Sequence, residues 1–322
     1  MQHPPVFLIC SERSGSNLIS RIVGAHSAFY APPPFHFGQN VLLNLHQTLA
    51  GGTQSVAWQR MCNRIPKRLE KLLGTKKEAQ AAAAWLSAQD QIDPHRLARF
   101  LYIDATPAAA GKRVFIKENN LHKLLFFILE CFPDAKFIFQ VRDPRDYFAS
   151  AAALREGTKN KFGTTKNALR IWKEDQLGGL HALGVLGPER VFLHRYEDLL
   201  IDAEAVLRRL CLFLDQSFEP EMLDFHSTEE ATTLAGSNRQ RQNVAKPLMT
   251  TNFAKFRHAL PAQQIRLVEK RLGRLMHQFG YPLDKMKITS KGRIVPRSSP
   301  GDKGGYQARP LLSPLDYGPP DT

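Results

Sequence analysis

The fold of this chain is decided by one stretch near its start: Val6-Phe7-Leu8-Ile9-Cys10-Ser11-Glu12-Arg13-Ser14-Gly15-Ser16-Asn17-Leu18. A continuous apolar run, typical of a buried parallel strand, is followed by a small polar turn and then by apolar residues at helical spacing. A strand, turn and helix in this order direct several backbone N–H groups and the positive end of a helix dipole to one point. Such a point binds phosphate or sulfate, so the stretch predicts an anion-binding turn.

The side chains of the turn indicate which anion it binds. Gly15 allows the backbone to approach the ligand closely, Ser14, Ser16 and Asn17 supply donors, and Arg13 supplies a planar, permanently charged fork. In the ATP-binding motif G-x-x-x-x-G-K-[ST], a Lys follows the last Gly and a hydroxyl then holds magnesium. Here Ser16 and Asn17 stand at those two positions. The turn therefore favours a nucleotide whose end group is transferred without magnesium.

Three further apolar runs predict strands, namely Val114–Ile116, Lys136–Val141 and Val191–Leu193. Helical stripes lie between and after the predicted strands. The stripes are Leu18, Ile19, Ile22 and Val23, then Leu121, Leu124, Leu125, Ile128 and Leu129, and last Ile265, Val268, Leu272, Leu275, Met276 and Phe279 after Pro261. Alternating strands and helices predict an α/β fold with a parallel β-sheet flanked by helices.

A second anion-binding segment follows the third of the four predicted strands. Arg142 stands at the end of this strand, Pro144 suits the start of a helix, and Ser150 follows Arg142 by eight residues. An Arg at the carboxyl end of a strand, beside a helix start, is placed to hold a phosphate. The alternative is a local pair between Arg142 and Asp143 or Asp146.

The two segments together resemble the PAPS-dependent sulfotransferases, whose donor is 3′-phosphoadenosine 5′-phosphosulfate. Arg13-Ser14-Gly15-Ser16-Asn17-Leu18 resembles their 5′-phosphosulfate-binding loop. Arg142 and Ser150 match the positions that bind the 3′-phosphate, and they follow the first motif in the expected order. The resemblance implies a P-loop NTPase-like sulfotransferase fold, PAPS as the donor with PAP (3′-phosphoadenosine 5′-phosphate) as its product, and no metal.

Two weaker matches extend the resemblance to about residues 5–283. Val191–Leu199 ends in Tyr-Glu-Asp-Leu, and the resemblance implies that Tyr196 lies near the adenine. Gln242–Pro247 resembles tyrosylprotein sulfotransferases, in which the Lys before Pro, here Lys246, contacts the cofactor. The layout of the motifs is closest to bacterial and tyrosylprotein-type members.

The expected catalytic residues are Arg13, Lys117 and His36. Arg13 would stabilise the leaving group, and Lys117 resembles the strand-end Lys that neutralises the transferring group in cytosolic sulfotransferases, although an exposed structural Lys is equally expected there. The general base departs from the family. Asn119 stands where cytosolic members carry the catalytic His, and Pro34 stands where tyrosylprotein members carry a Glu.

His36, which follows a run of prolines, is the replacement that we expect, because imidazole titrates near neutral pH. Glu118 is the second candidate for the base, and a surface or core role for His36 is the alternative.

The net charge of +14 has two main sources. Lys285 to Arg309 holds seven Lys and Arg against one Asp, and Arg60 to Lys77 holds seven against one Glu. The Leu residues of the second cluster predict a helix with a solvated basic face. Zinc-finger spacing and an aromatic-interleaved basic platform are absent from the sequence, so we expect no nucleic-acid partner.

The predicted organisation is a sulfotransferase domain over residues 1–284 and a basic Pro/Gly-rich tail over 285–322 without a core of its own. An insert at about residues 50–103 and the loop Thr228–Asn243 are expected to shape the acceptor pocket; their mixed apolar and basic character suits an amphipathic or anionic acceptor. The acceptor class stays open among small molecules, carbohydrates, lipids and peptides, as does the oligomeric state.

The chain has no run apolar enough to span a membrane and no recognisable signal peptide. Its four widely spaced cysteines form no Cys-x-x-Cys pair. These features predict a reduced, cytoplasmic protein. Three functional alternatives remain: a metal-dependent, ATP-using phosphotransferase, a basic protein that binds nucleic acid or membrane surfaces, and a sulfotransferase fold that has lost catalysis.

Overall fold

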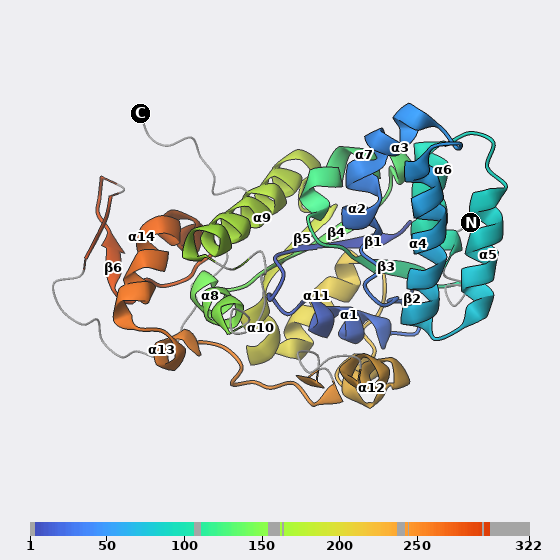
Figure 1. Ribbon diagram of the computed structural model, residues 1–322. Coiled ribbons are helices and arrows are strands. Elements are labelled where there is room, and N and C mark those ends of the chain that lie inside the picture. The colour runs from blue at the N-terminus through green and yellow to red at the C-terminus, as the bar shows by residue number, and fades with distance from the viewer. Residues whose placement is uncertain are drawn as a thin grey trace. The chain divides into compact units, whose positions relative to one another are not determined.

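The chain folds as an α/β protein around a five-stranded sheet with the strand order β2-β3-β1-β4-β5 (Figure 1). The computed structural model describes residues 4–105, 111–153, 162, 164–236, 242–243, 245–291 and 293–296. The strands are β1 (Val6–Cys10), β2 (Phe29–Tyr30), β3 (Arg113–Lys117), β4 (Lys136–Val141), β5 (Val191–Arg195), and an antiparallel pair β6 (Met286–Ile288) and β7 (Ile294–Pro296).

The helices are α1 (Ser16–Gly24), α2 (Phe37–Asn40), α3 (Leu45–Gly51), α4 (Val56–Leu73), α5 (Lys76–Ser87), α6 (Pro94–Arg99), α7 (Leu125–Cys131), α8 (Pro144–Ala152), α9 (Thr165–Leu186), α10 (Tyr196–Ile201), α11 (Ala203–Phe213), α12 (Glu229–Gly236), α13 (Phe256–Ala259) and α14 (Ala262–Gln278). Shorter turns of helix occur at Leu42–Asn44, Phe100–Asp104, Leu121–Leu124, Pro220–Met222 and Phe225–Ser227. Within the described ranges, no helix has the length and apolar content needed to cross a bilayer.

The sequence-based fold class is confirmed, and all four predicted strands are present. The β1 and β4 bounds agree with the prediction, while β3 and β5 are longer by one or two residues at their ends. The β1–β3 and β2–β3 pairs are parallel, with Val6 opposite Phe115 and Phe29 opposite Arg113. The two-residue strand β2 was not predicted, because a segment so short carries no periodicity. The stripe at Leu121–Leu129 is divided between a 3₁₀ turn and α7.

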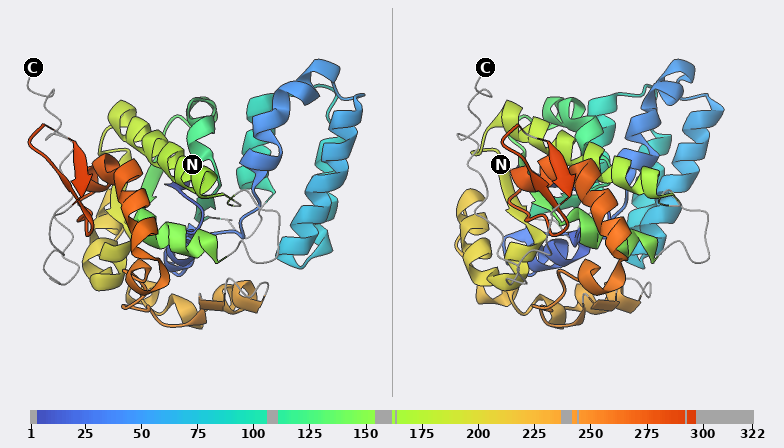
Figure 2. Two further views of the ribbon diagram at one scale, coloured as in Figure 1. Left: turned by 60° about the vertical axis from the view of Figure 1, so that its left-hand side comes forward. Right: turned by 90° about the vertical axis from the view of Figure 1, so that its left-hand side faces the viewer.

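The chain divides into two compact units, and the first comprises Met1–Ile9, Ser16–Ile138 and Cys211–Pro247. In this unit α4 and α5 pack along each other, as Figures 1 and 2 show. Helix α4 begins where the Ser55 hydroxyl accepts a hydrogen bond from the Trp58 N–H, and it ends at Gly74, whose φ is 73°. These two helices fill most of the insert that was predicted at about residues 50–103.

The second unit comprises Cys10–Gly15, Phe139–Leu210 and Leu248–Thr322, and in it α8, α9 and α14 pack against one another (Figure 1). A buried ion-pair network joins α8 to α14. Arg145 donates to both oxygens of Asp143, from Nε over 3.0 Å and from Nη2 over 2.7 Å, and its Nη1 donates to Glu269 over 2.8 Å. All three side chains are almost fully buried.

The same network holds the residues that follow α14. Glu269 accepts hydrogen bonds from the backbone N–H groups of Asp284, Lys285 and Met286 at 2.8 to 2.9 Å. The Met286 side chain is buried, and β6 and β7 pack against α14. The sequence indicated no regular structure after Leu283, so this hairpin corrects that expectation; its three-residue strands are too short to predict. The domain boundary at residue 285 stays a prediction, and residues 297–322 lie outside the described ranges.

We expect Arg145→Met to destabilise the fold by about 3–5 kcal/mol, because the substitution leaves two buried carboxylates without the cation that neutralises them. The measurement is urea unfolding at pH 7. Arg170→Met is the matched control: the Arg170–Glu174 pair on α9 is exposed, and removing such a pair costs less than about 1 kcal/mol. Equal losses in the two variants would show that the Arg145 network does not hold α8 and α14 together.

Candidate functional site

The predicted anion-binding turn, Ser11–Gly15, has the tight backbone that an anion cradle needs. Arg13 and Gly15 have φ angles of 67° and 84°, in the left-handed region that favours glycine. A Cβ atom on Gly15 would lie 2.3 Å from ring atoms of Tyr196, which is far inside van der Waals contact. Glycine is therefore required here both for the turn and for the close approach of Tyr196.

The structure brings the two predicted anion-binding segments together within the second unit. Arg13 Nε donates to Ser150 Oγ over 3.2 Å, and Arg142 Nη1 donates to the Arg13 carbonyl over 2.8 Å. The side-chain amide of Gln140, on β4, donates to the Ser14 carbonyl. Residues 129 positions apart in the sequence thus form one cationic cluster, made of the turn and the β4–α8 junction.

The carboxylates near Arg142 in the sequence interact with groups other than Arg142. Asp143 pairs with Arg145, and Asp146 accepts a hydrogen bond from the Phe256 N–H over 2.8 Å. The local pair that was the alternative for Arg142 is therefore not formed. The Arg142 guanidinium instead lies over the Tyr196 ring, 4.6 Å from its centroid.

The electrostatics of the cluster favour an anionic ligand. Burial lowers the pKa of Arg13, and the positive charge of Arg142 lowers it further, because two cations close together disfavour each other. Ser14 Oγ and Arg142 Nε are buried and have no hydrogen-bond partner within the described residues. A phosphate-type ligand would satisfy both donors and relieve the repulsion.

The other residues expected on the cofactor side are placed as follows. Ser16 and Asn17 form the first turn of α1, directly after the loop, and Asn17 Oδ1 is buried without a partner in the described part of the chain. Tyr196, the first residue of α10, is buried, and its hydroxyl accepts a hydrogen bond from Asn252 Nδ2 over 2.8 Å. Sequence reasoning missed Asn252, which belongs to no motif. Lys246 is exposed.

The expected acceptor-side residues lie in the first unit. Lys117 is the last residue of β3, and Glu118 follows it. His36 has a φ of 55° and precedes α2, and its Nδ1 lies 4.0 Å from Glu118 Oε2. The two candidates for the general base are therefore neighbours in space, although 82 positions separate them in the sequence.

Burial controls the protonation of Glu118. It raises the pKa of the Glu118 carboxyl to about 8, although hydrogen bonds from the Gly38 and Phe37 N–H groups oppose the shift. A side chain at Gly38 would meet Glu118 Oε2 at 3.3 Å, so glycine allows α2 to approach the carboxyl closely. Tyr102 OH and Glu118 Oε2 are buried, and both lie against Gly38.

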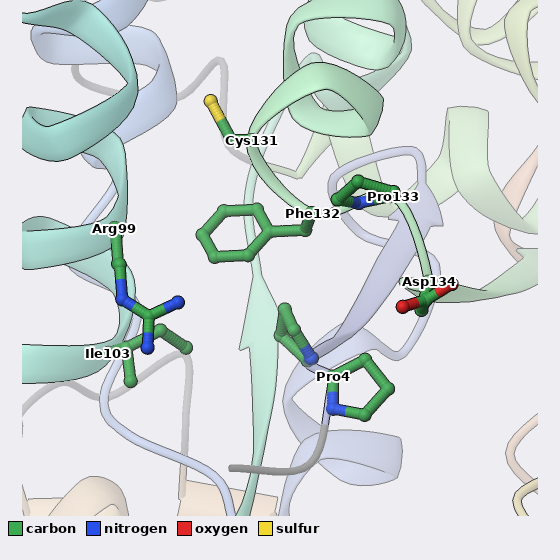
Figure 3. A pocket seen from close by; sticks show the side chains of 8 residues that line it. Pro4, Arg99, Ile103, Cys131, Phe132, Pro133 and Asp134 are labelled. Atoms are coloured by element: carbon green, nitrogen blue, oxygen red, sulfur yellow. The ribbon is translucent and has the colours of Figure 1, made fainter. Parts of the chain in front are cut away.

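A cavity of about 170 Å³ lies where β1 and β4 begin, and it is lined by Pro4, Arg99, Cys131, Phe132 and Asp134 among others (Figure 3). In Figure 3 Arg99 and Ile103 face Phe132 across this space. Ligands of parallel sheets bind beyond the carboxyl ends of the strands, whereas this cavity lies at the amino ends. We therefore assign it no part in the candidate site.

Comparison with known proteins agrees with the geometry. Residues 4–220 match the model of the sulfotransferase family. A protein-tyrosine sulfotransferase of Drosophila melanogaster is 25% identical over 232 residues, which are 69% of this chain and 40% of the relative. Carbohydrate sulfotransferase 3 of Tetronarce californica is 27% identical over 207 residues, 59% of this chain and 46% of the relative. The chain thus spans less than half the length of these curated relatives.

Two solved structures resemble the chain over most of its length. The sulfotransferase domain of the olefin synthase of Synechococcus PCC 7002 is 25% identical with a TM-score of 0.59, covering 83% of this chain and 94% of that domain. The sulfotransferase domain of the curacin biosynthetic pathway has a TM-score of 0.55 at 21% identity. The match covers 88% of this chain and 100% of that domain and indicates a shared fold.

The raised pKa of Glu118 predicts a pH-dependent stability. A carboxyl with a pKa of about 8 in the folded state and 4.5 in the unfolded state binds its proton more tightly when folded. Its contribution to stability is complete below pH 4.5 and is lost as the pH rises toward 8. Between these values wild type should lose up to about 1.4 kcal/mol per pH unit relative to Glu118→Gln, which carries no ionisable group.

The measurement is urea unfolding of both proteins at intervals from pH 5 to about pH 9. A difference in stability that stays constant across this range would contradict the raised pKa.

Proposed function

The chain belongs to the sulfotransferase family, and on this premise we propose that it transfers a sulfuryl group from PAPS to a hydroxyl or amine acceptor by metal-independent in-line displacement. The observation that carries the proposal is the cluster of Arg13, Ser150 and Arg142. The Arg13 guanidinium donates to the Ser150 hydroxyl over 3.2 Å, and the Arg142 guanidinium donates to the Arg13 backbone carbonyl over 2.8 Å, so that two cations from separate segments gather there. Such a cluster suits a nucleotide with two separate anionic groups better than one with a single anionic end.

The residues of the turn and those that follow it have distinct roles in this proposal. Ser14, Gly15 and the following residues Ser16 and Asn17 hold the 5′-phosphosulfate, and Arg13 stabilises the negative charge that develops on the leaving phosphate. PAPS, when bound, supplies the activated sulfuryl group.

The 3′-phosphate is held by Arg142 and Ser150. Tyr196, fixed by Asn252 and covered by the Arg142 guanidinium, offers an aromatic surface for the adenine. Lys246 contacts the cofactor in the same proposal.

On the acceptor side, His36 removes the proton from the acceptor and Glu118 lies beside it. The 4.0 Å approach of the two side chains supports this assignment, because a carboxyl next to an imidazole can orient the ring. Lys117, the last residue of β3, neutralises charge on the transferring group.

We also propose a cytoplasmic location, which is supported by four cysteines of which none forms a disulfide.

Titration with PAP tests the donor. We expect metal-independent binding of PAP in the presence of a chelator, tighter than the binding of AMP or ATP. Arg142→Ala should weaken the binding of PAP by about 10- to 100-fold, which corresponds to the loss of one charge-assisted hydrogen bond. The affinity for AMP should change little, because AMP lacks the 3′-phosphate. Isothermal calorimetry gives both constants. Arg170→Ala, an exposed change on α9, is the control and should bind PAP like wild type.

Three outcomes would contradict the proposal. Equal affinity for PAP and AMP would show that the protein does not recognise the 3′-phosphate. A requirement for magnesium together with a preference for ATP would favour the phosphotransferase alternative. Salt-sensitive binding of nucleic acid that survives Arg13→Ala and Arg142→Ala would favour the basic binding protein.

Turnover separates the two candidates for the general base. If His36 is the base, His36→Ala should lower kcat by about 100-fold or more and leave PAP affinity unchanged, because the imidazole takes no part in holding the cofactor. Glu118→Gln should then have a smaller effect on kcat than His36→Ala. The reverse order would make Glu118 the base, and full turnover in both variants would exclude the pair.

A further inference from the structure

A second cavity, of about 370 Å³, lies between α4 and the α2–α3 segment in the first unit. Four of its lining residues are cations, namely Arg60, Arg64, Lys67 and Arg68, and no lining residue is acidic. Arg60, Arg64 and Arg68 recur every four residues and therefore project from one face of α4. The basic cluster that the sequence predicted as a solvated helix face thus lines a cavity.

Three of these cations have no partner of their own. Arg60, Arg64 and Lys67 are exposed and make no hydrogen bond or ion pair within the described residues. Arg68 differs, because its Nε donates to the Phe35 carbonyl. Like charges at this spacing repel one another, so the apo cavity carries an electrostatic cost that an anion would remove.

The floor of the cavity is apolar. Met61 and Ile65 lie on α4 between the cations, and they and Phe37 are buried. A volume of about 370 Å³ is within the range of small-molecule sites, and an apolar floor with a few charged groups is typical of such sites. The combination fits a ligand that is apolar along most of its length and anionic at one end.

The cavity adjoins the proposed acceptor side. Phe37, which lines it, directly follows His36, and the Phe37 N–H bonds to Glu118. The Phe35 and Phe37 rings stack with centroids 5.1 Å apart, and Arg68 fixes this segment through Phe35. The buried oxygen atoms Tyr102 OH and Glu118 Oε2 lie against Gly38, the residue after Phe37, and can accept or orient a hydroxyl group.

We infer that this cavity selects the acceptor, and that the acceptor is a small amphiphile with an anionic head. The head group binds Arg60, Arg64 and Lys67, the apolar part lies on Met61 and Ile65, and the hydroxyl at the opposite end reaches His36 and Glu118. Only the statement that the hydroxyl reaches His36 and Glu118 rests on the proposed sulfuryl transfer. The other two statements concern binding and stand by themselves.

The binding test uses octyl phosphate, below its micelle concentration, with octanol and inorganic phosphate as probes of each half alone. We expect octyl phosphate to bind at least 10-fold more tightly than either. Arg64→Glu should abolish the preference for octyl phosphate over octanol, and Arg60→Ala should weaken the binding of octyl phosphate by about 10-fold. The matched control is Lys71→Ala, an exposed cation of α4 outside the cavity, which should change nothing.

A further variant separates the cavity from the proposed cofactor site. Octyl phosphate should bind Arg142→Ala as tightly as wild type, whereas binding that is lost in Arg142→Ala would show that the phosphate occupies the nucleotide site and would overturn the inference. Equal affinities for octanol and octyl phosphate would also overturn it. PAP titration of Arg60→Ala, Arg64→Glu and wild type should give one common affinity. Failure of wild type to bind PAP would refute the proposed function without affecting the octyl phosphate result.

The acceptor role is tested by turnover with PAPS. We expect transfer to 8-hydroxyoctyl phosphate at a kcat/KM at least 10-fold above that for 1,8-octanediol, and we expect Arg64→Glu to remove the difference. If octyl phosphate binds as expected but 8-hydroxyoctyl phosphate is not sulfated faster than the diol, the cavity is not the acceptor site.

Discussion

The structure of the second unit depends on the buried guanidinium of Arg145. It bridges Asp143 and Glu269, and all three side chains are withdrawn from water. Burying charges is costly, so the network persists only because each charge has a close partner and further hydrogen bonds. Through it the start of α8, the body of α14 and the backbone after α14 are fixed to one another.

This network also determines what Arg142 can do. Asp143 is the carboxylate nearest to Arg142 in the sequence, but Arg145 donates hydrogen bonds to both oxygen atoms of Asp143. The backbone N–H of Asp143 donates to Glu197. Arg142 therefore points to the turn at Arg13 and to the Tyr196 ring rather than to an acidic partner. The structural ion pair between Asp143 and Arg145 thus leaves the Arg142 guanidinium without an acidic partner among the residues that the structure describes.

The proposed acceptor side follows a different physical rule. His36 and Glu118 lie 4.0 Å apart in a buried setting, where desolvation moves the pKa of the carboxyl toward neutrality. A chain without the His or Glu at the family's usual positions can therefore still place a titratable pair beside the end of β3. The basic face of α4 adds charge to the neighbouring cavity, and Arg60, Arg64 and Lys67 stay exposed there, so that these three cations keep their solvation until a ligand arrives.

The sequence alone predicts the strands β1, β3, β4 and β5, an anion-binding turn and the candidate positions Arg142 and Ser150, because these features are local: apolar runs, a Gly-containing turn and fixed spacings reveal them. The contact partners of the side chains emerge only in the folded chain. The Arg145–Glu269 pair, the contact of Asn252 with Tyr196, and the approach of His36 to Glu118 join residues that are distant in the chain and carry no motif. A helical pattern shows that the cations of α4 share one face, but packing against the α2–α3 segment decided that this face lines a cavity. Long-range packing is a property of how faces meet in space, and no local pattern encodes it.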